Sequence, residues 1–285
     1  TIAGQTAKVA LNYRGQIWNS SINLRQVDCH FDPKMGFARR TDIRSGGVTN
    51  ELVRRSGTSI IDRFEVGHFA EYMTDDDEGR YLGASTGVYT STSLARRYYL
   101  RLSSDVYEDV VDEAFELPND REVPAGAYDG LRMDASLGAR RARNPFGELG
   151  YAWDGGFYGG QRHSARFVLG STLGPHVRLV GRAENSWLVF ADAPIDRTTT
   201  FNGDIKLAFN PRLFADFNLQ ANTVESTGRV LGRLRWRYLP GSDLYLVYRE
   251  DLDIRYQRLG QDLSSIMSVE RSITVKLTYW YDAFL

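Results

Sequence analysis

Apolar side chains recur at every second position along most of this chain. In the clearest segment, Ile273, Val275 and Leu277 fall on one face of an extended strand, whereas Thr274 and Lys276 fall on the other. Successive side chains of a β-strand point to opposite faces of its sheet, so a period of two is the signature of strands. The three-and-four spacing of an amphipathic helix is nearly absent. The sequence therefore predicts an all-β chain.

The same pattern repeats in roughly 14–16 segments, each about 10 residues long, which is the length that a tilted strand needs to cross a bilayer. Short breaks such as Pro240-Gly241 carry turn-forming residues. Longer polar stretches, residues 28–45, 108–125 and 254–270, separate other segments. Short turns that alternate with long loops are typical of outer-membrane barrels. We therefore expect a single domain over residues 1–285, an antiparallel transmembrane β-barrel of the outer-membrane type.

The composition agrees with this expectation. The chain has 35 Lys and Arg residues against 36 Asp and Glu residues, a formal charge of -1, and 42% hydrophobic residues. This balance lacks the positive excess that nucleic-acid binding requires, so we expect no nucleic-acid partner. No stretch approaches the roughly 18 consecutive apolar residues of a membrane helix. The mean hydropathy of -0.38 still suits a membrane barrel, because half of each strand faces a polar interior.

A soluble β-sandwich or β-propeller is the main structural alternative. Sandwich strands are usually about 5 to 6 residues long, and their cores place bulky side chains near the strand middles. The strands predicted here are longer, and aromatic residues such as Tyr13, Tyr72, Tyr238 and Tyr279 fall near strand ends. Aromatic girdles at the two membrane interfaces explain that placement. The pattern therefore favours the barrel.

Charged side chains alternate with the apolar ones, so in a barrel they line the interior. In residues 229–237, four arginines fall on one face of a single strand. A ladder of arginines can select anionic solutes, because charged rings set the selectivity of pores. Alternatively, opposed charges pair across the lumen and brace the wall, which the near-neutral total favours. The predicted lumen-lining residues are Arg101, Arg132, Asp134, Arg166, Arg178, Arg182, Glu184, Asp204, Asp216, Arg229, Arg233, Arg235 and Arg237.

The polar stretch that follows residues 26–27 carries a specific motif. It reads Phe-Asp-Pro-Lys-Met-Gly-Phe over residues 31–37 and continues Ala-Arg-Arg-Thr-Asp-Ile over residues 38–43. It resembles the F-(N/D)-P-x-x-G-F-x-x-R-x-D loop of a bacterial family of unknown function, whose members join an N-terminal module similar to family-nine carbohydrate-binding domains to a C-terminal outer-membrane β-barrel. Residues 234–248 and 271–279 are similar to that family's penultimate hairpin and closing strand. The loop residues that carry the likeness are Phe31, Asp32, Pro33, Gly36, Phe37, Arg40 and Asp42.

That resemblance implies a location in the bacterial outer membrane. It also implies contact with outer-membrane lipid and lipopolysaccharide, assembly by the barrel insertion machinery, and a glycan bound through an attached module. This chain would then be the C-terminal barrel portion of a longer precursor. It ends in Ala283-Phe284-Leu285 rather than in the terminal aromatic residue that is commoner among outer-membrane barrels. The family supplies a fold and a compartment, but no reaction.

No catalytic constellation stands out in the sequence. The four histidines, His30, His68, His163 and His176, lack the spacing of a metalloprotease site, and there is no Gly-x-Ser-x-Gly elbow. Cys29 is adjacent to His30, and neighbours in a strand point to opposite faces, so we expect no shared metal there. We therefore predict no catalytic, cofactor-binding or metal-binding residues, and a chain that is not an enzyme.

The densest acidic cluster consists of Asp75, Asp76 and Asp77. Calcium prefers oxygen ligands of this kind, but the spacing of an EF-hand is absent. We expect these residues to form a solvated loop, with a bound divalent cation as the weaker alternative.

These observations lead to three functional hypotheses. The leading one is a membrane anchor or conduit for an attached glycan-binding module or partner complex. The alternative is a porin-like channel or uptake pore for small or saccharide solutes. The third is an outer-membrane hydrolase, which requires a histidine aligned with a nucleophile or an acid at the external rim.

Overall fold

The chain is almost entirely β-strand. The one helical segment among the described residues is the 3-10 turn η1 (Phe157–Gly159). The all-β prediction is therefore confirmed. Across the described part, no helix is both long enough and apolar enough to span a membrane. The computed structural model describes residues 4–30, 41–56, 60–117, 121–139, 144–254 and 266–280.

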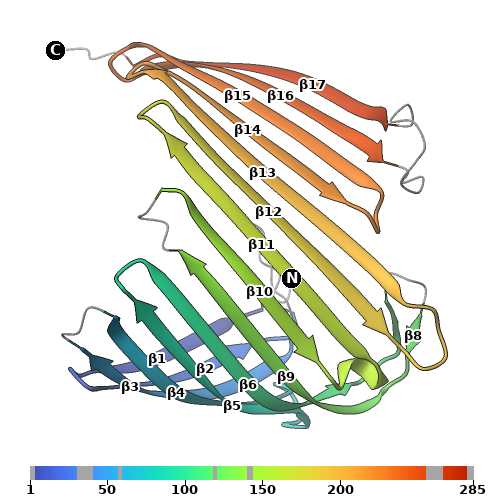
Figure 1. Ribbon diagram of the computed structural model, residues 1–285. Helices are drawn as coiled ribbons and strands as arrows, with labels where there is room; N and C mark the ends of the chain where they lie inside the picture. Colours follow the sequence, from blue (N-terminus) through green and yellow to red (C-terminus); the bar gives the residue numbers. More distant parts are fainter. Residues whose placement is uncertain are drawn as a thin grey trace, which may run out of the picture. The chain divides into compact units, whose positions relative to one another are not determined.

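Within these residues, fifteen strands form one antiparallel sheet in chain order, and Figure 1 colours them from blue to red. This number agrees with the roughly 14–16 strands expected, whereas the transmembrane barrel stays a prediction. A separate hairpin consists of β7 (Phe115–Glu116) and β8 (Glu122–Val123). The strands of the sheet are β1 (Thr6–Arg14), β2 (Trp18–Val27), β3 (Ile43–Arg55), β4 (Ile61–Thr74), β5 (Tyr81–Leu94), β6 (Tyr98–Val111), β9 (Gly126–Ala139), β10 (Phe146–Asp154), β11 (Gln161–Leu173), β12 (Val177–Val189), β13 (Asp196–Asn210), β14 (Leu213–Asn222), β15 (Thr227–Leu239), β16 (Ser242–Ile254) and β17 (Ile266–Thr278).

The chain divides into two compact units, and each is described by itself. Strands β1 to β6 lie wholly in unit 1, and strands β13 to β17 lie wholly in unit 2. Unit 1 comprises Thr1–Leu137, Tyr151–His163 and Leu188–Ile195. Unit 2 comprises Gly138–Gly150, Ser164–Trp187 and Asp196–Leu285.

In unit 1, the register of the strands separates an apolar face from a polar face. One row of directly paired residues across β3, β4, β5 and β6 consists of Leu52, Val66, Thr90 and Leu102. The next row consists of Glu51, Gly67, Tyr89 and Ser103. Because adjacent rows point to opposite faces, the first row belongs to the apolar face and the second to the polar face. The three large apolar side chains of the first row are 55%, 40% and 43% exposed.

Unit 2 has the same two-faced character. An apolar row across β13 to β17 consists of Leu207, Ala215, Leu234, Leu246 and Val275. The neighbouring polar row begins with Lys206, Asp216 and Arg233 on β13, β14 and β15. The register thus aligns the alternate apolar residues of successive strands, and in each unit they form one continuous apolar face.

Apolar side chains in the described residues are exposed far more often than they are buried. There are 42 large exposed hydrophobic side chains, against 10 buried hydrophobic residues, one of which is Ala215. One of the small buried clusters in unit 1 contains Val27, Ile43 and Leu82. A soluble sheet normally buries its apolar face against a second layer. Exposed apolar surfaces of this extent usually mark places where a protein contacts another protein or a membrane.

Aromatic rings on the polar face lie over glycines of neighbouring strands. Tyr89 on β5 lies over its paired Gly67 on β4, and its hydroxyl donates to Glu51 Oε2 on β3 at 3.0 Å. In unit 2, the ring of Phe146 covers Gly170 in the same way. A Cβ atom at either glycine would overlap the ring, so only glycine allows this close approach.

Most of the predicted loop motif, from Phe31 to Arg40, lies outside the described residues. Asp42 is described, and its backbone has a left-handed φ of 56°. Its Oδ1 accepts a hydrogen bond from the backbone N–H of Asp76 at 3.1 Å. Asp42 therefore links the start of β3 to the turn that follows β4.

Candidate functional site

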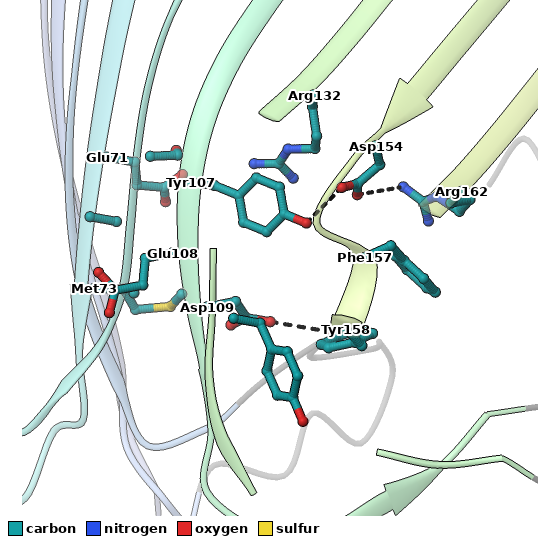
Figure 2. Close-up of a pocket in the computed structure, with 14 residues that line it drawn as sticks. Glu71, Met73, Tyr107, Glu108, Asp109, Arg132, Asp154, Phe157, Tyr158 and Arg162 are labelled. Atoms are coloured by element: carbon teal, nitrogen blue, oxygen red, sulfur yellow. Dashed lines mark hydrogen bonds and ion pairs between the residues drawn. The ribbon is translucent and has the colours of Figure 1, made fainter. Parts of the chain in front are cut away.

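A hollow of about 320 Å³ opens on the polar face of unit 1, beside η1 (Figure 2). Five residues define its geometry. Tyr107 comes from β6, Arg132 from β9 and Asp154 from the end of β10, whereas Phe157 and Tyr158 come from η1. Strands β6, β9 and β10 are consecutive neighbours in the sheet, and these three polar side chains line the hollow from one face of it.

Asp154 is the buried polar anchor of this hollow, with 5% of its surface exposed. Its Oδ1 accepts a 2.6 Å hydrogen bond from the Tyr107 hydroxyl and a 3.3 Å bond from the backbone N–H of Gly156. Its Oδ2 lies 3.8 Å from a terminal nitrogen of Arg162. A separation of 3.8 Å is an ion pair but not a hydrogen bond. Oδ2 therefore retains capacity to accept a hydrogen bond from a ligand.

Two guanidinium groups are held against aromatic rings at the hollow. The Arg132 Cζ atom lies 4.1 Å from the centre of the Tyr107 ring, and the Arg162 Cζ atom lies 4.8 Å from that of Phe157. Arg132 also donates to Asp105 Oδ2 from Nε at 2.9 Å, and its terminal nitrogen lies 2.7 Å from the same oxygen. Stacking fixes the plane of each guanidinium and hence the direction of its N–H groups.

Tyr158 forms the aromatic side of the hollow. Its ring centre lies 5.3 Å from the rings of both Phe115 and Tyr128 and 4.9 Å from that of Phe157. Its hydroxyl donates to Asp109 Oδ2 at 3.3 Å. The backbone of Tyr158 has a φ of 46°, a conformation that costs a non-glycine residue about 1–3 kcal/mol and persists only where the surroundings hold it.

The β7–β8 hairpin provides those surroundings. Leu117, which follows β7, and Val123 of β8 form a buried cluster with Phe190, and aromatic side chains of the hollow pack on this cluster. Arg121 stacks over Phe190 at 3.9 Å and lies 2.9 Å from Asp192 Oδ1. That hydrogen bond from Arg121 holds the pKa of Asp192 below its usual value. The hairpin therefore braces the aromatic side of the hollow.

Glu71 on β4 completes the lining. Its side chain is exposed, and within the described residues it has no hydrogen-bond or ion-pair partner. Glu108 also lines the hollow, but its carboxylate accepts a 3.2 Å hydrogen bond from the Tyr81 hydroxyl. Glu71 is thus a second carboxylate of the lining, beside Asp154, that can accept hydrogen bonds from a ligand.

Many of the arginines predicted to line a lumen pair with carboxylates on adjacent strands of the polar face. Arg182 lies 2.5 Å from Asp204, and Arg233 lies 2.7 Å from Asp216. Arg235 and Arg237 share Asp243, at 2.8 and 3.6 Å, and Arg229 reaches Asp251 at 2.6 Å. The partner acids Asp105, Asp243 and Asp251 were not predicted. These charges pair along the sheet, between neighbouring strands, and so neutralise the polar face locally.

The remaining predicted residues lie on the same faces. Arg101 stacks on Tyr99 at 4.6 Å, and Arg178 lies 5.8 Å from the ring of Phe146. Only Arg132 of the predicted set lies at the hollow. Asp134 is two positions from Arg132 on β9, and Glu184 is two positions from Arg182 on β12, so each lies on the same face as that arginine. Arg166 lies on β11.

The acidic cluster departs from the expected solvated loop. Asp75 and Asp76 are buried, with 4% and 8% exposed, whereas Asp77 is exposed. Asp75 Oδ1 accepts hydrogen bonds from the backbone N–H groups of Glu78 at 3.0 Å and Arg80 at 2.9 Å. Burial alone would raise the pKa of Asp75, but these N–H donors outweigh it and hold the pKa below its usual value. The expectation was wrong because it ignored donors within the turn.

Donors from distant strands also occupy Asp76. Gln26 Nε2 on β2 donates to its Oδ1 at 2.8 Å, and Arg44 Nε on β3 lies 2.6 Å from the same oxygen. Oxygens already committed to N–H donors are poor ligands for a cation. The geometry therefore gives the predicted divalent cation at Asp75, Asp76 and Asp77 no support.

Cys29 and His30 lie in a turn after β2, not in a strand as expected. Their ligand atoms and that of Asp28 lie within 4.8 Å of one another, so the argument from opposite strand faces was wrong. However, Cys29 Sγ and Asp28 Oδ1 both approach the same ring nitrogen, His30 Nδ1, at 3.0 and 3.4 Å. A nucleophile–base–acid relay needs both ring nitrogens. Desolvation and nearby carboxylates, Asp77 first, also raise the pKa of the Cys29 thiol.

The other three histidines contact neutral groups. His68 Nε2 lies 2.9 Å from Thr86 Oγ1, and His163 Nδ1 lies 2.7 Å from the Tyr151 hydroxyl. His176 Nδ1 lies 2.6 Å from the carbonyl oxygen of Ala208. None of these three histidines contacts both a nucleophile and a carboxylate among the described residues, and His30 meets Cys29 and Asp28 through one ring nitrogen only.

Sequence reasoning missed most of the hollow. Tyr107, Asp154 and Arg162 are single residues of three different strands, and only the register reveals that they converge. One local signal exists: residues 155–160 place two aromatic residues between two pairs of glycines. Such a segment predicts a tight aromatic turn with close backbone approach.

No protein-family model, curated protein or solved structure matches this chain. The likeness of residues 31–43 to a bacterial barrel family therefore stays a prediction.

Proposed function

We propose that this chain is a β-barrel of the bacterial outer membrane that serves as an anchor or conduit for an attached glycan-binding module or partner complex. The observation that carries the proposal is the open apolar face of each unit. In unit 2 it is exemplified by the row Leu207, Ala215, Leu234, Leu246 and Val275. Lipid would cover such a face without a second protein layer.

Strand length supports this proposal. Strands β13, β15, β16 and β17 contain between 13 and 15 residues. A tilted transmembrane strand needs about 9–11 residues, so each of these strands is long enough to cross the hydrocarbon core and reach both interfaces. Strands of soluble proteins typically contain only about 5–6 residues.

Aromatic pairs near the strand ends give further support. Tyr13 and Trp18 have ring centres 5.7 Å apart beside the β1–β2 turn, and Trp236 and Tyr238 have ring centres 6.1 Å apart beside the β15–β16 turn. Tyrosine and tryptophan favour the boundary between lipid and water, because their rings are apolar and each carries a polar group.

The polar face favours an anchor or conduit over an anion-selective pore. Its arginines are paired with carboxylates of adjacent strands, as in Arg233–Asp216 and Arg229–Asp251. A paired guanidinium attracts a passing anion far less than a free one does. The main role of these pairs is therefore to hold neighbouring strands in register.

A solute channel is the second candidate, and the hollow beside η1 is the observation that favours it. Its lining combines charged groups with aromatic rings, which is the usual composition of a ligand site. The hydrolase hypothesis gains no support, because His30 meets Cys29 and Asp28 through a single ring nitrogen and the other three histidines contact neutral groups.

Planar-bilayer recording with the purified full chain separates the two candidates. A sealed membrane containing demonstrably inserted protein supports the anchor, whereas a stable ohmic conductance supports the channel. Failure to insert at all, with the folded protein monodisperse in buffer without detergent, would contradict both.

A further inference from the structure

We infer that the hollow beside η1 binds an uncharged polyhydroxylated ring, of the size of one monosaccharide unit. This inference deepens the proposed function. It rests on that proposal in one respect: the polar face of unit 1 has to be in contact with water. Five groups carry the argument: the Asp154 carboxylate, the Arg162 guanidinium, the Glu71 carboxylate, and the Phe157 and Tyr158 rings.

Size limits the ligand first. The hollow of about 320 Å³ lies near the lower end of the roughly 300–1,000 Å³ that ligand sites occupy. A single six-membered ring with its substituents fits this volume, whereas a folded peptide segment does not.

Charge limits the ligand next. Arg132 is already paired with Asp105, and Arg162 faces Asp154. The lining has four carboxylates, from Glu71, Glu108, Asp109 and Asp154, against these two guanidiniums, so it has no excess of positive charge to hold an anion. A cation is disfavoured because three of the four carboxylates already accept hydrogen bonds from tyrosine hydroxyls. The protein's own guanidinium groups also lie over the Tyr107 and Phe157 rings. An uncharged ligand remains.

Hydrogen-bonding capacity identifies the kind of uncharged ligand. The gap of 3.8 Å between Arg162 and Asp154 Oδ2 leaves a donor and an acceptor side by side without a direct hydrogen bond. A hydroxyl group both donates and accepts, so one hydroxyl satisfies both groups at once. The Glu71 carboxylate offers further acceptors without a competing partner in the described residues. Two or more hydroxyls on one ring match this arrangement.

The aromatic side of the hollow suits the other surface of such a ring. Phe157 and Tyr158 present carbon surface next to the polar groups, and the buried cluster behind them fixes their position. A ring that carries hydroxyls on its edge and C–H groups on its faces contacts both kinds of surface. Because the side chains are already held, little ordering is required on binding.

The test is a calorimetric titration of the detergent-solubilised full chain with D-glucose, D-galactose and maltose, with inorganic phosphate and putrescine as charged comparisons. We expect saturable binding of at least one sugar and none of the ions. Asp154→Asn and Arg162→Gln should each weaken sugar binding about tenfold or more, since each loses a hydrogen bond to the ligand.

Arg182→Gln is the matched control, because it breaks an arginine–carboxylate pair on the polar face of unit 2 and should leave sugar binding unchanged. Circular dichroism of each variant shows whether it is folded. Glu71→Gln, at an exposed position, tests the site if the Asp154 variant does not fold.

The inference is overturned by a folded chain that binds no sugar, or by tighter binding of phosphate or putrescine. Equal weakening by Arg182→Gln overturns it too, because binding would then lie elsewhere. Because the titration is made in detergent, a chain that binds sugar but fails to enter liposomes contradicts the membrane proposal and leaves the site intact.

Discussion

The hydroxyl of Tyr107 on β6 donates a 2.6 Å hydrogen bond to Asp154 at the end of β10, across 47 positions of sequence. Tyr107→Phe removes the donor and leaves a buried carboxylate with one fewer partner. We expect a loss of about 1–3 kcal/mol in the free energy of unfolding, measured by denaturant titration in detergent. Tyr245→Phe is the control, since its hydroxyl lies 3.5 Å from Asp243, which two arginines already bind. Equal losses in the two variants would show that the Tyr107–Asp154 hydrogen bond contributes no more to the free energy of unfolding than the Tyr245–Asp243 contact.

Gly67 is required by the ring of its strand partner Tyr89. Gly67→Ala forces the ring to move, and we expect a loss of about 1–3 kcal/mol in the free energy of unfolding. Gly181→Ala is the matched control, because a Cβ atom there meets nothing within 4 Å. If the two alanine variants are equally stable, the packing of Tyr89 on Gly67 does not hold β4 and β5 together.

Leu207 lies on the apolar face of β13, and its neighbour Lys206 lies on the polar face. Near the middle of a bilayer, Leu207→Arg should lower the stability of the inserted protein by about 2–4 kcal/mol. Lys206→Arg, one residue away on the other face, should change it by less than about 0.5 kcal/mol. Unfolding from liposomes measures both. Indifference to arginine at position 207 is incompatible with a lipid-covered face.

The turn after β4 should make stability depend on acid pH. The pKa of Asp75 is lowered in the folded chain, so its carboxylate contributes stability above its unfolded pKa of about 3.9, and this contribution is lost as the pH falls through the lower folded pKa. Unfolding measured between neutral and strongly acid pH should therefore be less pH-dependent in Asp75→Asn. Asp77→Asn, at the exposed neighbouring position, should retain the full dependence; the reverse order would contradict this assignment.

The two-faced sheet was predictable because the period of two survives in the sequence. Leu207 and Leu246 each belong to the set of alternate residues that is apolar in their own strand, and the register aligns them in one row. Closure of the sheet into a transmembrane barrel stays a prediction, because strand parity alone does not determine it.

The candidate site was much less predictable. Asp154 and Tyr107 become neighbours through the register of three strands, which no local pattern encodes. Asp75 and Asp76 gave a misleading signal, because their acidity suggests solvent while their burial depends on Arg80, Gln26 and Arg44. Long-range partners of this kind leave no trace in the spacing of a single sequence.

The most direct test of the membrane-spanning sheet is a labelling scan along β13 in liposomes. Single cysteines are placed at Asp204, Ile205, Lys206, Leu207 and Ala208 in a Cys29→Ser chain, labelled with a nitroxide, and exposed to lipid-soluble oxygen and to a water-soluble nickel chelate. A membrane-spanning sheet predicts alternation, with oxygen accessibility highest at positions 205 and 207 and lowest at positions 204, 206 and 208. Equal accessibility to the nickel chelate at all five positions would contradict it.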